Sequence, residues 1–423
     1  MSTHRFKAIA TAVATMIGSG AIAVVTSATA TAMTGHVTLT MQIVSDESLS
    51  MQPIVNSFEK ANPTISLDVK YIGGGNTFNT LLATELSNGT APEIFSTLPG
   101  SATQISVVPL GKSNYLENLA TQPWANEVPN DYKSAIGVGK AVYSPAIAIE
   151  SVASIYNATA LASHHLTIPR TFAQVLQFCS SAKSDGVAAY ALGAGTDYEN
   201  QMPIFLLEGT LVQRNDPAWM TQRGQNKVSF TKSGWLTAFT EEQEMLKDGC
   251  FAEDALGTTV NAAQTELAQG KALGYFGLSF QLPDIQALAK TASFTITTLP
   301  ATNNSSDTRL PIAIGAGLSM NAKISPALLP AAEQFFDYLM SPKQLALWSE
   351  LTDETPAFPD PLYKANPSTA SQVQEIKDNT TTLVPDQFFP NQIIRQDWIT
   401  GNEKMLAGEE TPLQIVQAMD GAW

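Results

Sequence analysis

The amino-acid sequence predicts an α/β fold with two lobes and a ligand cleft between them. Segments that alternate apolar and polar side chains, as strands do, take turns with helical segments. Residues 36–44 alternate in this way, and a helical run that ends at Asn62-Pro63 follows them. The alternation returns over 65–71, and a second helical run over 78–86 ends at Asn88-Gly89. Strand, helix, strand, helix is the order expected of an open α/β sheet, in which ligands bind beyond the carboxyl ends of strands.

The two lobes are predicted from the length of the chain and from one acidic residue. A chain of 423 residues is too long for a single hydrophobic core and suggests two or three domains. Residues 141–157 place Glu150 between two short apolar runs, in a stretch too short to span a membrane. We interpret this stretch as a strand that crosses between two bodies. Its carboxylate is then either paired or faces a water-filled cleft, because burial of an unpaired charge costs several kcal/mol.

The pattern after the crossing strand is more helical. Helices are expected to begin at caps formed by Thr171 and Ser233, and another at Ser341-Pro342. Trp235 and Trp348 lie at the spacing of core positions on these helices, which predicts a packing role for both.

Residues 1–32 are typical of a secretory signal peptide. Arg5 and Lys7 form a basic start, an Ala-rich apolar stretch follows over 8–25, and small residues come after it. Cleavage is expected after Ala30 or Ala32, with a retained membrane anchor as the alternative. No cysteine lies at this cleavage site, as a bacterial lipoprotein would require. We therefore expect an exported protein, periplasmic or associated with the cell surface, without that lipid anchor.

The charge and motif content exclude several function classes. The chain has 38 Asp and Glu against 23 Lys and Arg, so nucleic acid and anionic lipid would repel it. No G-x-S-x-G or H-E-x-x-H motif is present, and the histidines after the leader are His36, His164 and His165. We expect no enzyme, cofactor or metal site. A glycoside hydrolase with paired carboxylates remains open, because their separation in space is unknown.

The two cysteines, Cys179 and Cys250, leave two alternatives open. In an exported protein they form either a disulfide or two inert buried thiols.

Five short segments, in order along the chain, resemble the family 1 extracellular solute-binding proteins of ABC importers, the maltose-binding-protein-like carbohydrate uptake group. They are residues 58–63, 89–94, 156–157, 270–272 and 406–419. The resemblance covers nearly all of the chain after the leader. It implies a two-lobed periplasmic-binding-protein fold of the type II kind, with a hinge of crossing strands.

The resemblance also implies domain boundaries. The N-terminal lobe is expected over 36–147 plus 293–340, and the C-terminal lobe over 148–292 plus 341–423. Hinge residues are expected at Glu150, Phe294 and Met340.

Candidate ligand contacts in the first half of the chain follow predicted strands. Asp46 and Glu47 come directly after the first strand, although Glu47 is equally suited to capping the next helix. Thr97 and Ser101 lie in a loop after Phe95 where a turn also needs such residues. Glu150 is the strongest candidate, with a structural pair at the hinge as its alternative.

Candidates in the second half are implied by the resemblance. Tyr198 and Glu199 fill a loop where related proteins offer an aromatic ring and a carboxylate to a sugar. Phe280 stands where many relatives carry tryptophan, and it stacks on a sugar without donating a hydrogen bond. Arg395 and Trp398 lie near a position of an aromatic contact, with a surface cap as the alternative.

The expected function is binding without chemistry. A monomer captures a small polar ligand, most simply a sugar or oligosaccharide, by lobe closure and delivers it to a membrane permease. A polyamine or another cation is an alternative ligand for the same fold, since Asp46, Glu47, Glu150 and Glu199 are acidic. An exported glycoside hydrolase is the rival from another class.

Overall fold

The computed structural model describes residues 35–252, 254–315, 317–358 and 360–423. The expected signal peptide lies outside these ranges, and the residues from His36 to Trp423 form one unit. Among the described residues, no helix has the length and apolar character needed to cross a membrane.

The first sheet has four strands in the order β11, β3, β1, β2. Their bounds are β1 (Val37–Val44), β2 (Ile65–Ile72), β3 (Ile94–Thr97) and β11 (Gly317–Met320). β1 runs parallel to β2 and β3, whereas β11 is antiparallel to β3. The two strands expected from alternation over 36–44 and 65–71 are thereby confirmed, and they pair with each other from Val37 opposite Ile65 onward.

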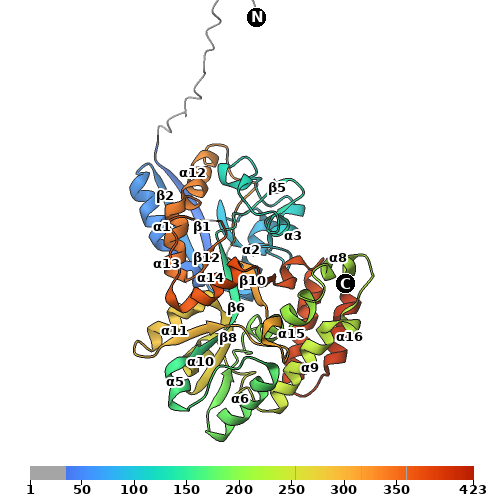
Figure 1. Cartoon of the computed structure of the whole chain (residues 1–423). Coiled ribbons are helices and arrows are strands. Elements are labelled where there is room, and N and C mark those ends of the chain that lie inside the picture. Colours follow the sequence, from blue (N-terminus) through green and yellow to red (C-terminus); the bar gives the residue numbers. More distant parts are fainter. Residues whose placement is uncertain (1–34, 253, 316, 359) are drawn as a thin grey trace, which may run out of the picture. The chain divides into compact units, whose positions relative to one another are not determined.

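Helices cover both faces of this sheet, with α1, α12 and α13 on one side and α2 and α3 on the other (Figure 1). Phe58 of α1 and Phe335 of α12 pack edge to face, with ring centroids 5.1 Å apart. The bounds are α1 (Ser48–Ala61), α2 (Asn76–Asn88), α3 (Val107–Lys112), α4 (Lys133–Ile136), α12 (Leu329–Leu339) and α13 (Pro342–Thr352). A short hairpin joins β4 (Gly137–Val138) to β5 (Ala141–Val142).

The second sheet is built around β6 (Ala148–Asn157), the strand that contains Glu150. The path is β13, β10, β6, β8, β7, and β9 and β12 also pair with β6. The bounds are β7 (Ala188–Ala191), β8 (Ala272–Leu278), β9 (Phe294–Thr297), β10 (Leu310–Ile314), β12 (Thr355–Pro356) and β13 (Thr381–Leu383). β6 therefore organises this half of the structure by pairing with four strands.

Successive side chains of β6 point to opposite faces of the second sheet, and each face carries a hydrophobic core. Tyr156 contributes to a core with α6, α7, α9, α15 and α16, whereas Ile155 contributes to a core with α10 and α11. The helices are α5 (Ala158–Ser163), α6 (Phe172–Ser184), α7 (Met202–Glu208), α8 (Trp219–Gly224), α9 (Gly234–Lys247), α10 (Val260–Ala268), α11 (Leu282–Leu288), α14 (Ala370–Lys377), α15 (Gln392–Leu406) and α16 (Pro412–Ala422).

The predicted helix caps fare differently. Thr171 caps α6, because its side chain accepts a hydrogen bond from the backbone N–H of Gln174. Ser233 and Ser341 stand at the N-cap positions of α9 and α13, but each hydroxyl donates to the backbone carbonyl three residues earlier. Their predicted capping hydrogen bonds are therefore absent from the described structure.

Cys179 of α6 and Cys250, which follows α9, form a disulfide. The structure thereby selects the first of the two alternatives that the sequence leaves open. The bridge ties α6 to the end of α9, across a separation of 71 residues.

The chain passes between the two sheets beside the first residues of β6. Ile314 of β10 pairs with Ile149, and Gly317 then pairs with Thr97 in the first sheet. The chain comes back after α13, where Thr355 of β12 also pairs with Ile149. Strand pairing groups β9 and β10 with the second sheet, while α13 packs on α1. The exact lobe boundaries stay a prediction.

Candidate functional site

Three acids, one buried and two partly buried, lie within electrostatic reach of one another where the chain passes between the sheets. Glu47 follows β1, Glu150 lies in β6, and Glu354 lies between α13 and β12. Burial raises the pKa of Glu150 well above its ordinary value, and the charges of Glu354, Glu47 and Asp386 raise it further. Residues far apart in the sequence thus form one acidic cluster, which we call the acid cluster: Glu47, Glu150 and Glu354.

Glu47 belongs to a single helical turn, η1 (Ser45–Glu47), between β1 and α1. Its carboxylate accepts a hydrogen bond from the hydroxyl of Ser96 at 3.1 Å, and Ser96 also accepts from the backbone N–H of Val44. Glu47 occupies the N-cap position of α1 but its side chain makes no capping hydrogen bond. Burial, with a smaller contribution from neighbouring acids, raises its pKa from 4.5 to about 8. Capping therefore does not account for this side chain.

Glu354 is a member of the acid cluster that the sequence did not reveal. It is 3% exposed, and the indole N–H of Trp348 donates to its carboxylate at 2.6 Å. Gly315 makes room for it, because a Cβ at that position would lie 2.9 Å from Oε1 of Glu354. Burial raises the pKa of Glu354. Its proximity to Glu150 depends on the pairing of β12 with β6, and no local sequence pattern predicts that pairing.

Asp46 and Tyr198 extend the site from two different halves of the structure. Burial raises the pKa of Tyr198, and the charges of Glu199, Asp46, Glu150 and Asp197 raise it further. Asp46 belongs to η1 and is exposed, whereas Tyr198 precedes the turn η3 (Glu199–Gln201) in the other half of the structure. The electrostatic coupling brings together four of the residues that the sequence singles out: Asp46, Glu47, Glu150 and Tyr198.

Glu199 follows Tyr198 in the chain and is fully buried. Its Oε1 accepts hydrogen bonds from the hydroxyl of Tyr275 at 2.8 Å and from the side-chain amide of Gln281 at 2.7 Å. Burial raises its pKa to about 7, although these hydrogen bonds act in the opposite direction. Glu199 therefore anchors the turn that carries Tyr198.

Thr97 and Ser101 make contacts inside the protein. Thr97 is 2% exposed, and its hydroxyl lies 2.8 Å from that of Ser319 on the neighbouring strand. Ser101 donates to the backbone carbonyl of Phe389 and lies 3.3 Å from that of Gln387. Both link segments of the fold, and among the described residues neither forms a hydrogen bond with a member of the acid cluster.

The three remaining candidates are distributed over the second half of the structure. Phe280 is half-buried in the turn η6 (Ser279–Gln281). Arg395 forms an ion pair with Asp386 at 3.2 Å, so its guanidinium already has a partner. Trp398 is fully buried and packs on Phe205 and Trp235, with centroid distances of 4.8 and 5.4 Å.

The expected hinge residues lie in different parts of the structure. Glu150 adjoins the chain passages described above, since it pairs with Ala313. Phe294 pairs with Asn157 at the far end of β6, and Met340 ends α12. The hinge assignment stays a prediction for all three residues.

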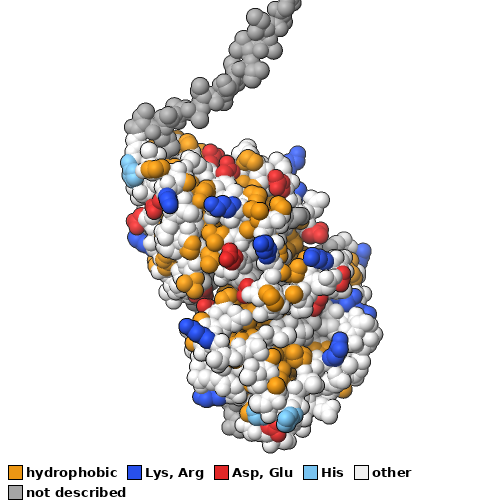
Figure 2. Space-filling model, turned by 60° about the vertical axis from the view of Figure 1, so that its left-hand side comes forward, with side chains coloured by type: hydrophobic (Ala, Val, Ile, Leu, Met, Phe, Trp, Pro, Cys, Tyr) orange, Lys and Arg blue, Asp and Glu red, His pale blue; other side chains and the backbone are white. Residues whose placement is uncertain are grey.

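The described residues contain no group of three His, Cys, Asp or Glu side chains arranged to hold a metal ion. On the face shown in Figure 2, acidic and basic side chains are scattered singly among polar and apolar ones. The concentration of acids at the acid cluster therefore differs from the mixed charge of that surface.

Comparison with known proteins identifies the class. Residues 53–374 match the family described as "Bacterial extracellular solute-binding protein", and the chain belongs to that family. Its members are non-catalytic receptors, exported from the cell, that bind a solute for an ABC transporter. A search of curated protein sequences found no match.

Solved structures share the periplasmic-binding-protein fold, which confirms the predicted fold class. A chitin oligosaccharide binding protein superposes with a TM-score of 0.77 at 16% identity, covering 91% of this chain and 98% of that chain. The solute-binding protein RafE in complex with raffinose superposes with a TM-score of 0.74 at 16% identity. The match covers 91% of this chain and 98% of that chain. A sugar transporter from Bacillus licheniformis in complex with stachyose superposes with a TM-score of 0.73 at 18% identity. The match covers 92% of this chain and 99% of that chain. At such identities the likeness concerns the fold.

Proposed function

We propose that this solute-binding protein captures a sugar or oligosaccharide between its lobes and delivers it to the permease of an ABC importer. The observation that carries the proposal is the convergence of Asp46, Glu47, Glu150 and Tyr198 from separate elements. The saccharides bound by similar solved structures support the same ligand class. Lobe closure would complete the site, because these residues come from both halves of the structure.

The chemistry of these side chains suits hydroxyl groups. A carboxylate accepts hydrogen bonds from sugar hydroxyls, and a protonated carboxyl also donates one. With a pKa raised to about 8, Glu47 can donate or accept a hydrogen bond near neutral pH, and the raised pKa of Glu150 favours its protonated form in the same way. Tyr198 and the half-buried Phe280 are candidates to cover the apolar CH face of a sugar ring.

We also propose that the hinge consists of three passages beside the start of β6. They are residues 144–148, residues 314 and 315 with 317, and residues 353–355. The backbone hydrogen bond from Gly315 to Ala148 at 2.9 Å and the pairing of Thr355 with Ile149 support this assignment. Rotation about short connecting segments next to a shared strand would move the two sheets relative to each other.

In the cell, we propose a monomer that is periplasmic or associated with the cell surface. The resemblance of residues 1–32 to a signal peptide supports this location.

A cationic ligand, such as a polyamine, is the second candidate. The observation that favours it is the acid cluster, in which no described ion pair supplies a cation to Glu47, Glu150 or Glu354. Salt separates the two candidates, because the affinity for a cation falls steeply with ionic strength and that for a neutral sugar does not.

A thermal-shift screen against mono- and oligosaccharides and polyamines tests the function. A ligand at 100 times its Kd adds about 2.7 kcal/mol to the free energy of unfolding. Glu150→Ala is expected to weaken binding of the ligand found at least about 10-fold, which corresponds to about 1.4 kcal/mol.

Glu127→Ala, which removes an exposed acid outside the acid cluster, is the matched control and should leave affinity unchanged. Wild-type affinity in Glu150→Ala would contradict the assigned site. Binding of polyamines alone would replace the sugar proposal with the second candidate.

A further inference from the structure

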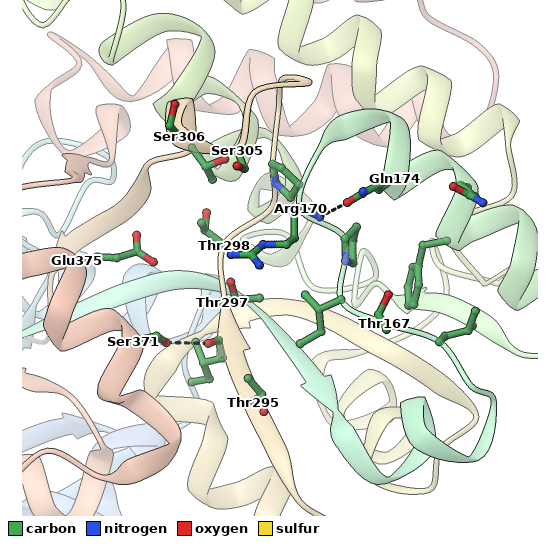
Figure 3. A pocket seen from close by; sticks show the side chains of 18 of the residues that line it. Thr167, Arg170, Gln174, Thr295, Thr297, Thr298, Ser305, Ser306, Ser371 and Glu375 are labelled. Carbon is green, nitrogen blue, oxygen red and sulfur yellow. Dashed lines mark hydrogen bonds between the residues drawn. The ribbon is translucent and has the colours of Figure 1, made fainter.

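A cavity of about 1000 Å³ lies against the second sheet, apart from the acid cluster (Figure 3). Residues 295–298, in β9 and just after it, line the cavity together with residues of three other segments. These are the loop 165–170 with the adjoining part of α6, the loop around η7 (Ser305–Asp307), and α14. None of the candidate ligand residues named above lines it. Its volume suits a small-molecule site.

Hydroxyl groups are concentrated along this cavity. Thr295 and Thr297 of β9 are two residues apart and therefore lie on one face of the strand. Figure 3 shows them with Thr298, Ser305 and Ser306 around the same cavity. Within the described sheet β9 pairs with β6 alone, and the hydroxyl of Ser371 donates to the carbonyl of Ile296 at 3.0 Å. The cavity is therefore bordered by a strand edge rich in hydroxyls.

Two arginines, Arg170 and Arg309, border the cavity. Arg170 is exposed, and its side chain extends into the cavity toward Thr298 (Figure 3). Nη1 of Arg309 donates to the backbone carbonyls of Ser306, Asp307 and Thr308 at 3.0 to 3.3 Å, which fixes its guanidinium against the loop. Among the described residues, neither arginine forms an ion pair within 4.0 Å. In a chain with a net charge of −15, two arginines without such a partner at one cavity favour an anion.

Glu375 of α14 also lines the cavity and lies across it from Arg170 (Figure 3). Burial raises its pKa to about 7, and the charge of Arg309 lowers it in part. The other charged or titratable side chains that line the cavity are His165, Arg170 and Arg309. Near neutral pH the single acid is thus only partly ionised, which leaves an excess of positive charge.

We propose that this cavity is a second binding site, for a saccharide that carries a carboxylate or phosphate group. Arg170 and Arg309 would hold the anionic group, since a guanidinium presents several N–H donors to one anion. The threonine and serine hydroxyls would exchange hydrogen bonds with the sugar hydroxyls. This site is independent of the proposed site between the lobes.

Isothermal titration calorimetry with trigalacturonate, glucose 6-phosphate and maltotriose tests the proposal. At least one of the two anionic sugars should bind, and neutral maltotriose should not compete for this site. Arg170→Ala should weaken anion binding at least about 10-fold, and the exposed side chain makes this variant safe for folding. Lys290→Ala removes the same charge from an exposed position outside the cavity and should leave the affinity for the anionic sugar unchanged.

Glu375→Gln provides a test in the opposite direction. It should tighten anion binding at pH 8, where the carboxylate is ionised, and have little effect at pH 6. Three results would overturn the proposal: neither anion binds, Arg170→Ala leaves anion affinity unchanged, or Glu150→Ala abolishes anion binding while Arg170→Ala does not. The last result would assign the anion to the site between the lobes.

Discussion

At the scale of single residues, the acid cluster depends on carboxyl groups that are partly or fully buried and have few hydrogen-bond donors. Glu47 has the hydroxyl of Ser96, and Glu354 has the indole of Trp348. Burial disfavours the charged form, so each acid keeps its proton to higher pH than it would in the unfolded chain. A ligand that supplies hydrogen bonds to these carboxyls would relieve part of this cost.

The stability of the ligand-free protein should therefore depend on Glu47 in a defined pH window. Its pKa is 4.5 for the ordinary side chain and about 8 in the folded state, so the folded state binds more protons between these values. The stabilising contribution is fully present below pH 4.5 and is lost as pH rises through 8. Each such acid changes the free energy of unfolding by up to about 1.4 kcal/mol per pH unit.

Urea denaturation of the wild type and of Glu47→Gln from pH 5 to pH 8 measures this effect. The variant should lose less stability with rising pH than the wild type. Glu127→Gln, at an exposed position, should follow the wild type. Parallel pH profiles for Glu47→Gln and the wild type would show that Glu47 is not a buried, proton-holding acid.

The passage between the two sheets depends on a glycine. A Cβ on Gly315 would approach Oε1 of Glu354 to 2.9 Å and the carbonyl oxygen of Ala148 to 3.2 Å. Gly315→Ala should therefore displace Glu354, destabilise the protein by about 1 to 3 kcal/mol and weaken ligand binding. Gly73→Ala is the control, because nothing lies within 4 Å of its Cβ position. Denaturant unfolding and ligand titration measure both effects, and a neutral Gly315→Ala would remove the steric argument.

At the scale of elements, the disulfide between Cys179 and Cys250 connects α6 to the end of α9. Closing a loop of about 71 residues restricts the unfolded chain, and loss of such a bridge costs about 2 to 5 kcal/mol. The double variant Cys179→Ala, Cys250→Ala should unfold at correspondingly lower urea concentration. Its ligand affinity should remain, because both cysteines lie in the hydrophobic core on one face of the second sheet. An unchanged midpoint would mean that the bridge contributes nothing to stability.

Local patterns predicted the elements well where one face of each element is buried. The alternation over 36–44 and 65–71 corresponds to β1 and β2, and Trp235 and Trp348 are buried as their helical spacing indicates. Glu354 was missed because its position depends on β12 pairing with a strand about 200 residues earlier. Such non-local pairing leaves no periodic signal in the sequence.

At the same scale, the candidates come from two kinds of argument, burial and position in the family pattern, and the structure gives them different surroundings. Glu150 was singled out because an acid inside an apolar strand needs a reason, and it lies in the acid cluster. The resemblance offers Trp398 as a ligand contact, whereas its side chain packs in the core of the second sheet. Side-chain direction on a helix is fixed by packing that the sequence does not display.

At the scale of the whole molecule, the two sheets are connected by the chain segments that lie beside the start of β6. Thr355 and Ile314 both pair with Ile149, so the chain connections gather at one end of a single strand. The acid cluster lies at the same place. A ligand bound there would contact residues from both halves, and its binding energy would favour the closed arrangement.

Small-angle X-ray scattering of the mature protein tests this central claim most directly. With a saturating amount of the saccharide found by the thermal-shift screen, the radius of gyration should decrease. Glu150→Ala should need a much higher ligand concentration for the same decrease, and Glu127→Ala should behave as the wild type. Superimposable scattering curves with and without a ligand of proven affinity would contradict closure around the acid cluster.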